Sequence, residues 1–167
     1  MRPVIDPMAR LVTAIEVFLL PSGGKADIAA FRAAIIEAAN VCAPAMTLQI
    51  SGLPVAVLMM DDAVRMIVSE IVAAGLVTEQ VVIGVSETDV ITQLDKFSEA
   101  VHALKAADIS LSLDDFVRGS AGLSLLTRIQ PDRIRIDASI SSQVDRSGPA
   151  RPWCRRLSNA VLHLKFW

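Results

Sequence analysis

The stretch that decides the fold runs from Ile109 to Leu126 and reads ISLSLDDFVRGSAGLSLL. It begins as an apolar run of strand type, and that run ends in two adjacent aspartates, Asp114 and Asp115. Neighbouring carboxylates repel each other, so this pair at the end of a buried segment requires an explanation. Two explanations are open. The aspartates bind a ligand, or Asp115 caps the helix that the sequence predicts next.

Four further runs, apolar and rich in β-branched residues, predict strands before and after this one. The five predicted strands are residues 10–20, 45–51, 79–87, 109–113 and 132–137. Helical spacing of apolar residues predicts helices at residues 25–39, 61–75, 89–108 and 121–129. Alternation of this kind is typical of a mostly parallel sheet with crossover helices, an α/β fold.

Composition limits the class of protein. The chain has 167 residues, of which 53% are hydrophobic and 20% charged, enough for one domain with a core. Its net charge of −2 gives no indication of a nucleic-acid partner. No apolar run approaches the roughly 20 residues of a membrane-spanning helix, which argues against a membrane partner. Cys42 and Cys154, in no metal-type spacing, favour a reducing compartment and hence a cytoplasmic protein.

Polar side chains lie within or at the ends of the predicted strands: Glu16, Gln49, Glu87, Asp114, Asp115 and Arg135. Ligands of parallel α/β folds gather at the carboxyl ends of strands, so the four acids are predicted to converge. Their repulsion requires a cation, and hard oxygen ligands suit weakly bound Mg²⁺ or Mn²⁺. A place in a helix cap region is the alternative for Glu87 and Asp115. Glu16 fits that alternative worst, because a carboxylate within an apolar run is costly to bury without a partner.

Five motifs in a fixed order give the chain a family resemblance over residues 3–139. They are IEVFLL with Glu16, LQIS, VIGVSE with Glu87, ISLSLDDF and IQPDRIRID. In this order they resemble the EAL domain, a family of cyclic di-guanylate (cyclic di-GMP) phosphodiesterases. The resemblance implies a TIM-barrel fold whose first strand runs antiparallel to the others. It also implies that Glu16, Glu87, Asp114 and Asp115 ligate two metals, which activate a water for attack on the phosphodiester.

Several positions depart from the family pattern. Leu20 stands where the family has the arginine that binds a substrate phosphate. Gln49 replaces the family's metal-binding asparagine, and Gly84 replaces the first glutamate of its E-x-T-E motif. The catalytic lysine is Arg135, which cannot readily be deprotonated. The flexible loop that begins at Asp115 also differs, over residues 115–122.

These departures imply a degenerate site, with Arg135 and Asp115 at the catalytic positions. The resemblance then implies a regulatory module that binds protein and has cyclic di-GMP as a candidate ligand. Two alternatives stay open: an active metal-dependent phosphodiesterase, because the four acids are present, and a fragment with no independent function.

The C-terminal part of the sequence differs from the rest. We expect a truncated EAL-like domain over residues 1–140 and a basic tail over residues 141–167, with a helix at about residues 152–164. The tail carries five Lys or Arg against one acid. A TIM barrel closes with eight strands, so five strands leave open edges and uncovered apolar surface. The sequence therefore predicts an incomplete TIM-barrel-like sheet that the tail, a protein partner or a second copy of the chain covers.

Overall fold

The structure is a computed structural model, and it describes residues 2–6, 11–19, 28–116, 122–136 and 165–166. Its elements are, in chain order, β1 (Arg2–Asp6), β2 (Leu11–Phe18), α1 (Ile28–Ala39), β3 (Thr47–Ser51), α2 (Val55–Leu58), α3 (Ala63–Ala73), the 3₁₀ turn η2 (Thr78–Gln80), β4 (Val81–Ser86), α4 (Glu87–Ile91), α5 (Leu94–Ala106), β5 (Ser110–Phe116), α6 (Gly122–Ile129), β6 (Arg133–Ile136) and β7 (Lys165–Phe166).

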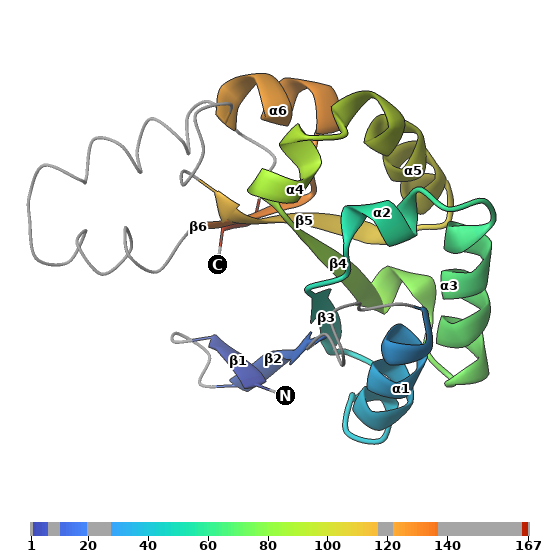
Figure 1. Ribbon diagram of the computed structural model, residues 1–167. Coiled ribbons are helices and arrows are strands. Elements are labelled where there is room, and N and C mark those ends of the chain that lie inside the picture. Colours follow the sequence, from blue (N-terminus) through green and yellow to red (C-terminus); the bar gives the residue numbers. More distant parts are fainter. Residues whose placement is uncertain (1, 7–10, 20–27, 117–121, 137–164, 167) are drawn as a thin grey trace, which may run out of the picture.

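The strands form one sheet of seven, in the order in which they occur in the chain. β1 runs antiparallel to β2, and every later neighbouring pair is parallel. Among the described strands, β1 and β7 form the two edges, so the sheet is open (Figure 1). The α/β fold and the incomplete TIM-barrel-like arrangement are thus confirmed. The antiparallel strand is β1, whereas the first predicted strand corresponds to β2 and runs parallel to β3.

The five predicted strands are present as β2 to β6, and the described part of the sheet has two further strands, β1 and β7, that the sequence did not predict. β1 contains Pro3 and ends at Asp6, two residue types that are rare inside strands and argue against one. An edge strand tolerates them, since one side of its backbone has no neighbour. β7 has only two residues, too few to produce a periodic pattern.

Successive residues of each strand face opposite sides of the sheet, and the two sides differ in chemistry. The outer side is apolar and packs against the helices, which lie along that side of the curved sheet (Figure 1). Its buried residues include Leu48, Ile50, Ile83, Leu111, Leu113 and Ile134. The inner side carries small and polar residues, among them Gln49, Ser51, Ser112 and Asp114, all buried.

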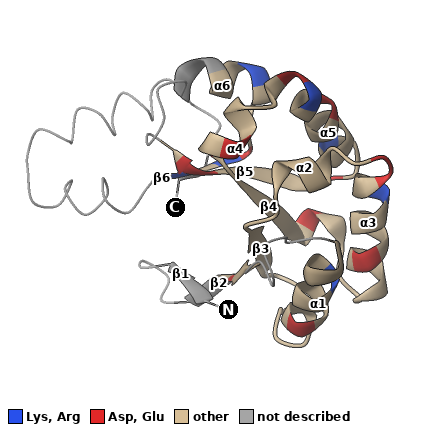
Figure 2. Ribbon diagram, in the orientation of Figure 1, with Lys and Arg blue, Asp and Glu red and all other residues tan. Residues whose placement is uncertain are grey.

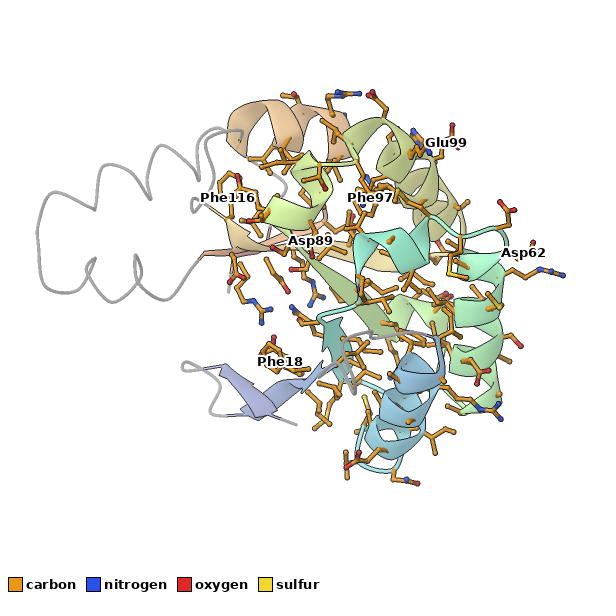
Figure 3. All side chains as sticks on the ribbon, viewed as in Figure 1. Phe18, Asp62, Asp89, Phe97, Glu99 and Phe116 are labelled. Carbon is orange, nitrogen blue, oxygen red and sulfur yellow. The ribbon has the colours of Figure 1, made fainter. Side chains whose placement is uncertain are left out.

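The long helices have an apolar side that packs against the sheet and a charged side that faces water. On α5, Phe97 points toward the sheet and is fully buried, whereas Glu99 points outward (Figure 3). Charged residues of both signs are interspersed over the exposed surfaces of α3 and α5 (Figure 2). No described helix combines the length and apolarity needed to span a bilayer.

Two helices end in the same hydrogen-bonded turn. After α3, the N–H of Gly75 donates to Val72 O (3.0 Å) and that of Leu76 to Ile71 O (3.1 Å). After α5, the N–H of Asp108 donates to Lys105 O (3.1 Å) and that of Ile109 to Leu104 O (3.0 Å). This Schellman pattern requires a left-handed residue, and Gly75 and Asp108 supply it with φ of 77° and 57°.

Only a small part of the predicted tail falls on described residues. Lys165 and Phe166 form β7 and pair in parallel with Arg133 and Ile134 of β6. The helix expected at about residues 152–164 lies outside the described residues, as does Leu20.

Candidate active site

Polar residues at the carboxyl ends of the strands line a cavity of about 480 Å³. Its lining residues are Glu16, Phe18, Ser51, Gly52, Leu53, Ser86, Asp89, Asp114, Asp115 and Arg135. The sequence predicted the site at this edge of the sheet, because the carboxyl ends of neighbouring parallel strands lie close together.

The register of the sheet explains why residues from different strands meet there. Glu16 lies opposite Gln49, Ser51 lies opposite Gly84, and Gly84 lies opposite Ser112. Partners in parallel strands face the same side of the sheet, so all of these positions belong to the inner face. These small and polar residues therefore lie on one face of four strands, on two neighbouring levels of the sheet.

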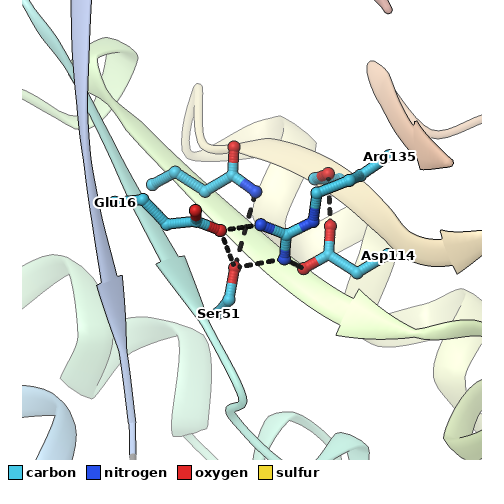
Figure 4. A network of polar contacts seen from close by, with 6 residues as sticks. Glu16, Ser51, Asp114 and Arg135 are labelled. Atoms are coloured by element: carbon cyan, nitrogen blue, oxygen red, sulfur yellow. Dashed lines mark hydrogen bonds and ion pairs between the residues drawn. The ribbon is translucent and has the colours of Figure 1, made fainter. Parts of the chain in front are cut away.

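Arg135 joins the two sides of the cavity (Figure 4). Its Nη1 forms an ion pair with Glu16 Oε1 on β2, and its Nη2 donates to Asp114 Oδ2 on β5. The same Nη2 donates to Ser51 Oγ at 3.0 Å, and the guanidinium carbon lies 5.4 Å from the centre of the Phe18 ring. One guanidinium thus contacts residues from three other strands.

Further hydrogen bonds extend this network along the inner face. Gln49 Nε2 donates to Ser51 Oγ (3.4 Å), and Ser51 Oγ donates to Glu16 Oε1 (3.3 Å). On β5, Ser112 Oγ donates to Asp114 Oδ1 at 2.8 Å. The side chains of Glu16 and Asp114 are only 12% and 7% exposed, so these polar contacts replace most of their hydration.

The adjacent aspartates have opposite surroundings. Asp114 is buried at 5% exposure, whereas Asp115 is exposed and has a left-handed backbone with φ of 56°. The register between β5 and β6 shifts between Leu113 and Phe116, so a local irregularity turns the two side chains apart. Both residues belong to β5, which continues to Phe116, so neither directly precedes a helix. The explanation of Asp115 as the cap of the next helix is therefore wrong.

Burial shifts the acidity of Asp114. Loss of hydration raises the pKa of its carboxyl to about 6, although hydrogen bonds from Ser112 and Ser51 act in the opposite direction. The nearby charge of Asp115 raises the pKa further. At neutral pH the group is still ionised and able to pair with Arg135.

Glu87 does not line this cavity. It is the first residue of the short helix α4, is 1% exposed, and lies in the first helical turn with Asp89. This agrees with the alternative reading of Glu87 as part of a helix cap region, where negative charge is favourable. Asp89, which the sequence analysis did not select, lines the cavity instead.

The structure therefore brings together Glu16, Gln49, Asp114 and Arg135 in one network, with Asp115 on the cavity wall and Glu87 outside it. Within the described part of the chain, no three acidic, histidine or cysteine side chains are gathered closely enough to hold a metal ion. Glu16 and Asp114 contact Arg135 instead. In this arrangement the residues do not fit a divalent cation, and the ligand and catalytic roles given above stay predictions.

Besides Asp89, the residues of the site that the sequence did not indicate include Phe18 and Ser112. Each lies two positions from a selected residue on the same strand, Phe18 from Glu16 and Ser112 from Asp114. Residues two apart in a strand share a face, so this spacing was the signal that could have found them.

Comparison with known proteins agrees with this geometry. Residues 23–166 match the EAL domain family. The chain is 34% identical over 163 residues to the blue light- and temperature-regulated antirepressor BluF of Escherichia coli, which covers 88% of this chain and 40% of BluF. The family match continues beyond residue 139, where the resemblance read from motifs ended.

Solved structures give the same result. BlrP1 of Klebsiella pneumoniae, in a manganese and cyclic di-GMP complex, superposes with a TM-score of 0.88 at 29% identity, over 98% of this chain and 46% of BlrP1. The EAL domain of Mycobacterium smegmatis DcpA shares the fold, with a TM-score of 0.78 at 23% identity over 93% of this chain and 70% of that one. The chain spans less than half the length of BluF and BlrP1. The chain belongs to the EAL domain family.

Proposed function

We propose that this chain is a regulatory EAL domain that binds a protein partner and cyclic di-GMP and does not hydrolyse the nucleotide. The antirepressor BluF and the cyclic di-GMP complex of BlrP1 support the two kinds of partner. By analogy with BluF, the protein partner is a repressor, and the chain acts in the cytoplasm.

The observation that carries the absence of hydrolysis is the position of Arg135. Hydrolysis of a phosphodiester needs an activated water, which metal ions or a general base supply. Arg135 contacts Glu16 and Asp114, the two acids that face each other across the cavity. Its guanidinium cannot accept a proton at neutral pH, so it does not replace a lysine or a base. Mg²⁺ or Mn²⁺ binds weakly here in this proposal, because a cation is already present.

A paired assay tests the proposal. Purified chain is incubated with cyclic di-GMP and Mn²⁺ or Mg²⁺, and the nucleotide is followed by chromatography while binding is titrated calorimetrically. We expect binding without turnover, and Phe18→Ala in the cavity should weaken binding. The control, Arg128→Ala, removes an exposed ion pair with Asp95 on another face and should change neither result. Turnover abolished by Asp114→Asn would instead identify an active phosphodiesterase.

The protein partner needs a separate test. A binding experiment would titrate candidate repressor proteins from the same organism with this chain, with and without cyclic di-GMP. We expect a complex whose stability changes with the nucleotide, because a regulatory domain must couple its two ligands. Equal affinity at all nucleotide concentrations would exclude cyclic di-GMP as the regulator.

A further inference from the structure

We infer that Arg135 is the resident cation of the cavity. Its guanidinium occupies the position between Glu16 and Asp114 that a divalent cation would need, so a metal ion enters only by displacing it. The inference concerns the charge balance of the site and holds whichever partner the domain binds.

The first argument is charge. Two carboxylates that are 12% and 7% exposed face each other, and burying such groups without a cation is strongly unfavourable. Arg135 gives one nitrogen to each of them. A divalent ion between the same oxygens would lie within contact distance of the guanidinium. Like charges at about 4 Å repel by roughly 1 kcal/mol per charge pair even in water, and more in a partly buried site.

The second argument is the fit of the site to a guanidinium. Ser51 Oγ accepts from Nη2 at 3.0 Å, and the Phe18 ring lies 5.4 Å from the guanidinium carbon. Aromatic faces favour a planar cation, and two forked nitrogens match two separate carboxylates. A lysine ammonium has one nitrogen and no planar face, so it would satisfy fewer of these contacts.

The third argument is the space beside Asp114. A Cβ atom at Gly84 would lie 2.7 Å from Ser51 Oγ and closer still to Asp114 Oδ2, well inside van der Waals contact. The Asp114 carboxylate therefore lies over Gly84 of β4, where it meets the Arg135 guanidinium, only because position 84 has no side chain. The contact between Asp114 and Arg135 therefore depends both on the arginine of β6 and on the glycine of β4.

The test is a Mn²⁺ titration of the full chain, by calorimetry and by thermal unfolding with Mn²⁺ or with a chelator. We expect a wild-type thermal midpoint that a chelator leaves unchanged. Arg135→Ala should bind Mn²⁺ at least about tenfold more tightly than wild type, and Mn²⁺ should raise its thermal midpoint. The matched control Arg128→Ala, which breaks an exposed Arg–Asp pair elsewhere, should behave as wild type.

A second variant keeps the test decisive if Arg135→Ala does not fold. Arg135→Lys retains the charge, loses one of the two nitrogens, and should bind Mn²⁺ with an affinity between those of wild type and Arg135→Ala. Unchanged Mn²⁺ affinity in Arg135→Lys, or a wild-type midpoint that falls on chelation, would overturn the inference. The inference shares its observation, the position of Arg135, with the proposed function, but these readouts involve neither nucleotide nor partner, so their failure is distinguishable from a failure of the binding and turnover assays.

Discussion

Asp114 and Asp115 are consecutive in the chain but have different surroundings: Asp114 is buried and Asp115 is exposed. The strand period places Asp114 on the inner face with Ser112, whereas Asp115 has a left-handed backbone. Non-glycine residues adopt this conformation where the surrounding structure holds them in it, and such residues gather at functional sites. The repulsion expected from the sequence is relieved by separation of the two side chains as well as by Arg135.

The raised pKa of Asp114 predicts how stability depends on pH. The folded pKa of about 6 lies above the ordinary value of 3.8, so ionisation is less favourable in the folded state. The stabilising contribution of Asp114 to the free energy of unfolding is then fully present below about pH 4 and is lost as the pH rises through 6. The shift corresponds to about 3 kcal/mol.

The measurement compares the free energy of unfolding of wild type with that of Asp114→Asn from pH 4 to 7. We expect the wild-type advantage over the variant to decrease across this range. An advantage that increases with pH would show that the Arg135 ion pair outweighs the burial of the carboxyl.

Gly84 supports a second prediction at the scale of one residue. Gly84→Ala places a Cβ against the Asp114 carboxylate and should lower the free energy of unfolding by about 1–3 kcal/mol, the usual cost of overpacking. In an Asp114→Ala background the same change should cost less, because the crowded group is absent. Equal costs in the two backgrounds would contradict the contact.

At the scale of the element, much of the fold was predictable. The apolar runs identified β2 to β6, and helical spacing identified α1, α3, α5 and α6, since burial against one partner layer imposes these periods. One predicted helix over residues 89–108 is in fact two, α4 and α5. A pattern of apolar residues does not report a short break of this kind.

The site was predictable only in part. Strand ends placed Glu16, Gln49, Asp114 and Arg135 at one edge, and the structure agrees. The bridging role of Arg135 was not predictable, because strand period fixes the face of a residue and says nothing of how far its side chain reaches. The prediction that Glu87 joins the other acids at the cavity was not met for a related reason: Glu87 follows β4 and belongs to the first turn of α4.

The two Schellman turns give a paired prediction. Gly75→Ala should lower the free energy of unfolding by about 1 kcal/mol, because a left-handed conformation is unfavourable for a residue with a Cβ and no atoms crowd this position. Asp108→Gly should raise it by up to about 1 kcal/mol, since it removes that strain. Chemical denaturation of both variants checks the signs. Two changes of the same sign would show that side-chain contacts, not backbone conformation, decide.

At the scale of the whole molecule, the open sheet predicts self-association. Among the described strands, β1 and β7 each pair on one side only, so their outer N–H and C=O groups offer edges to another chain. Exposed apolar residues include Val41, Val72 and Val77, each more than half exposed. A two-fold dimer is the commonest way for a chain to cover such surface.

Light scattering over a dilution series measures this. We expect a dimer mass at high micromolar concentration and dissociation on dilution. A charged substitution at one of these exposed valines, Val72→Glu, should lower the measured molar mass if Val72 lies in the dimer interface. His102→Ala on α5 serves as the exposed control. A constant monomer mass across the series, without aggregation, would refute the dimer.

The close packing at Gly84 also makes positions on different strands interdependent. A side chain at position 84, such as the glutamate that the family resemblance implies there, would leave no room for Asp114 in its present place. Exchanging glycine for glutamate alone would displace Asp114 and so remove one of the two carboxylates that Arg135 contacts. The residues at positions 84 and 135 therefore depend on each other through Asp114, although they do not pair in the sheet.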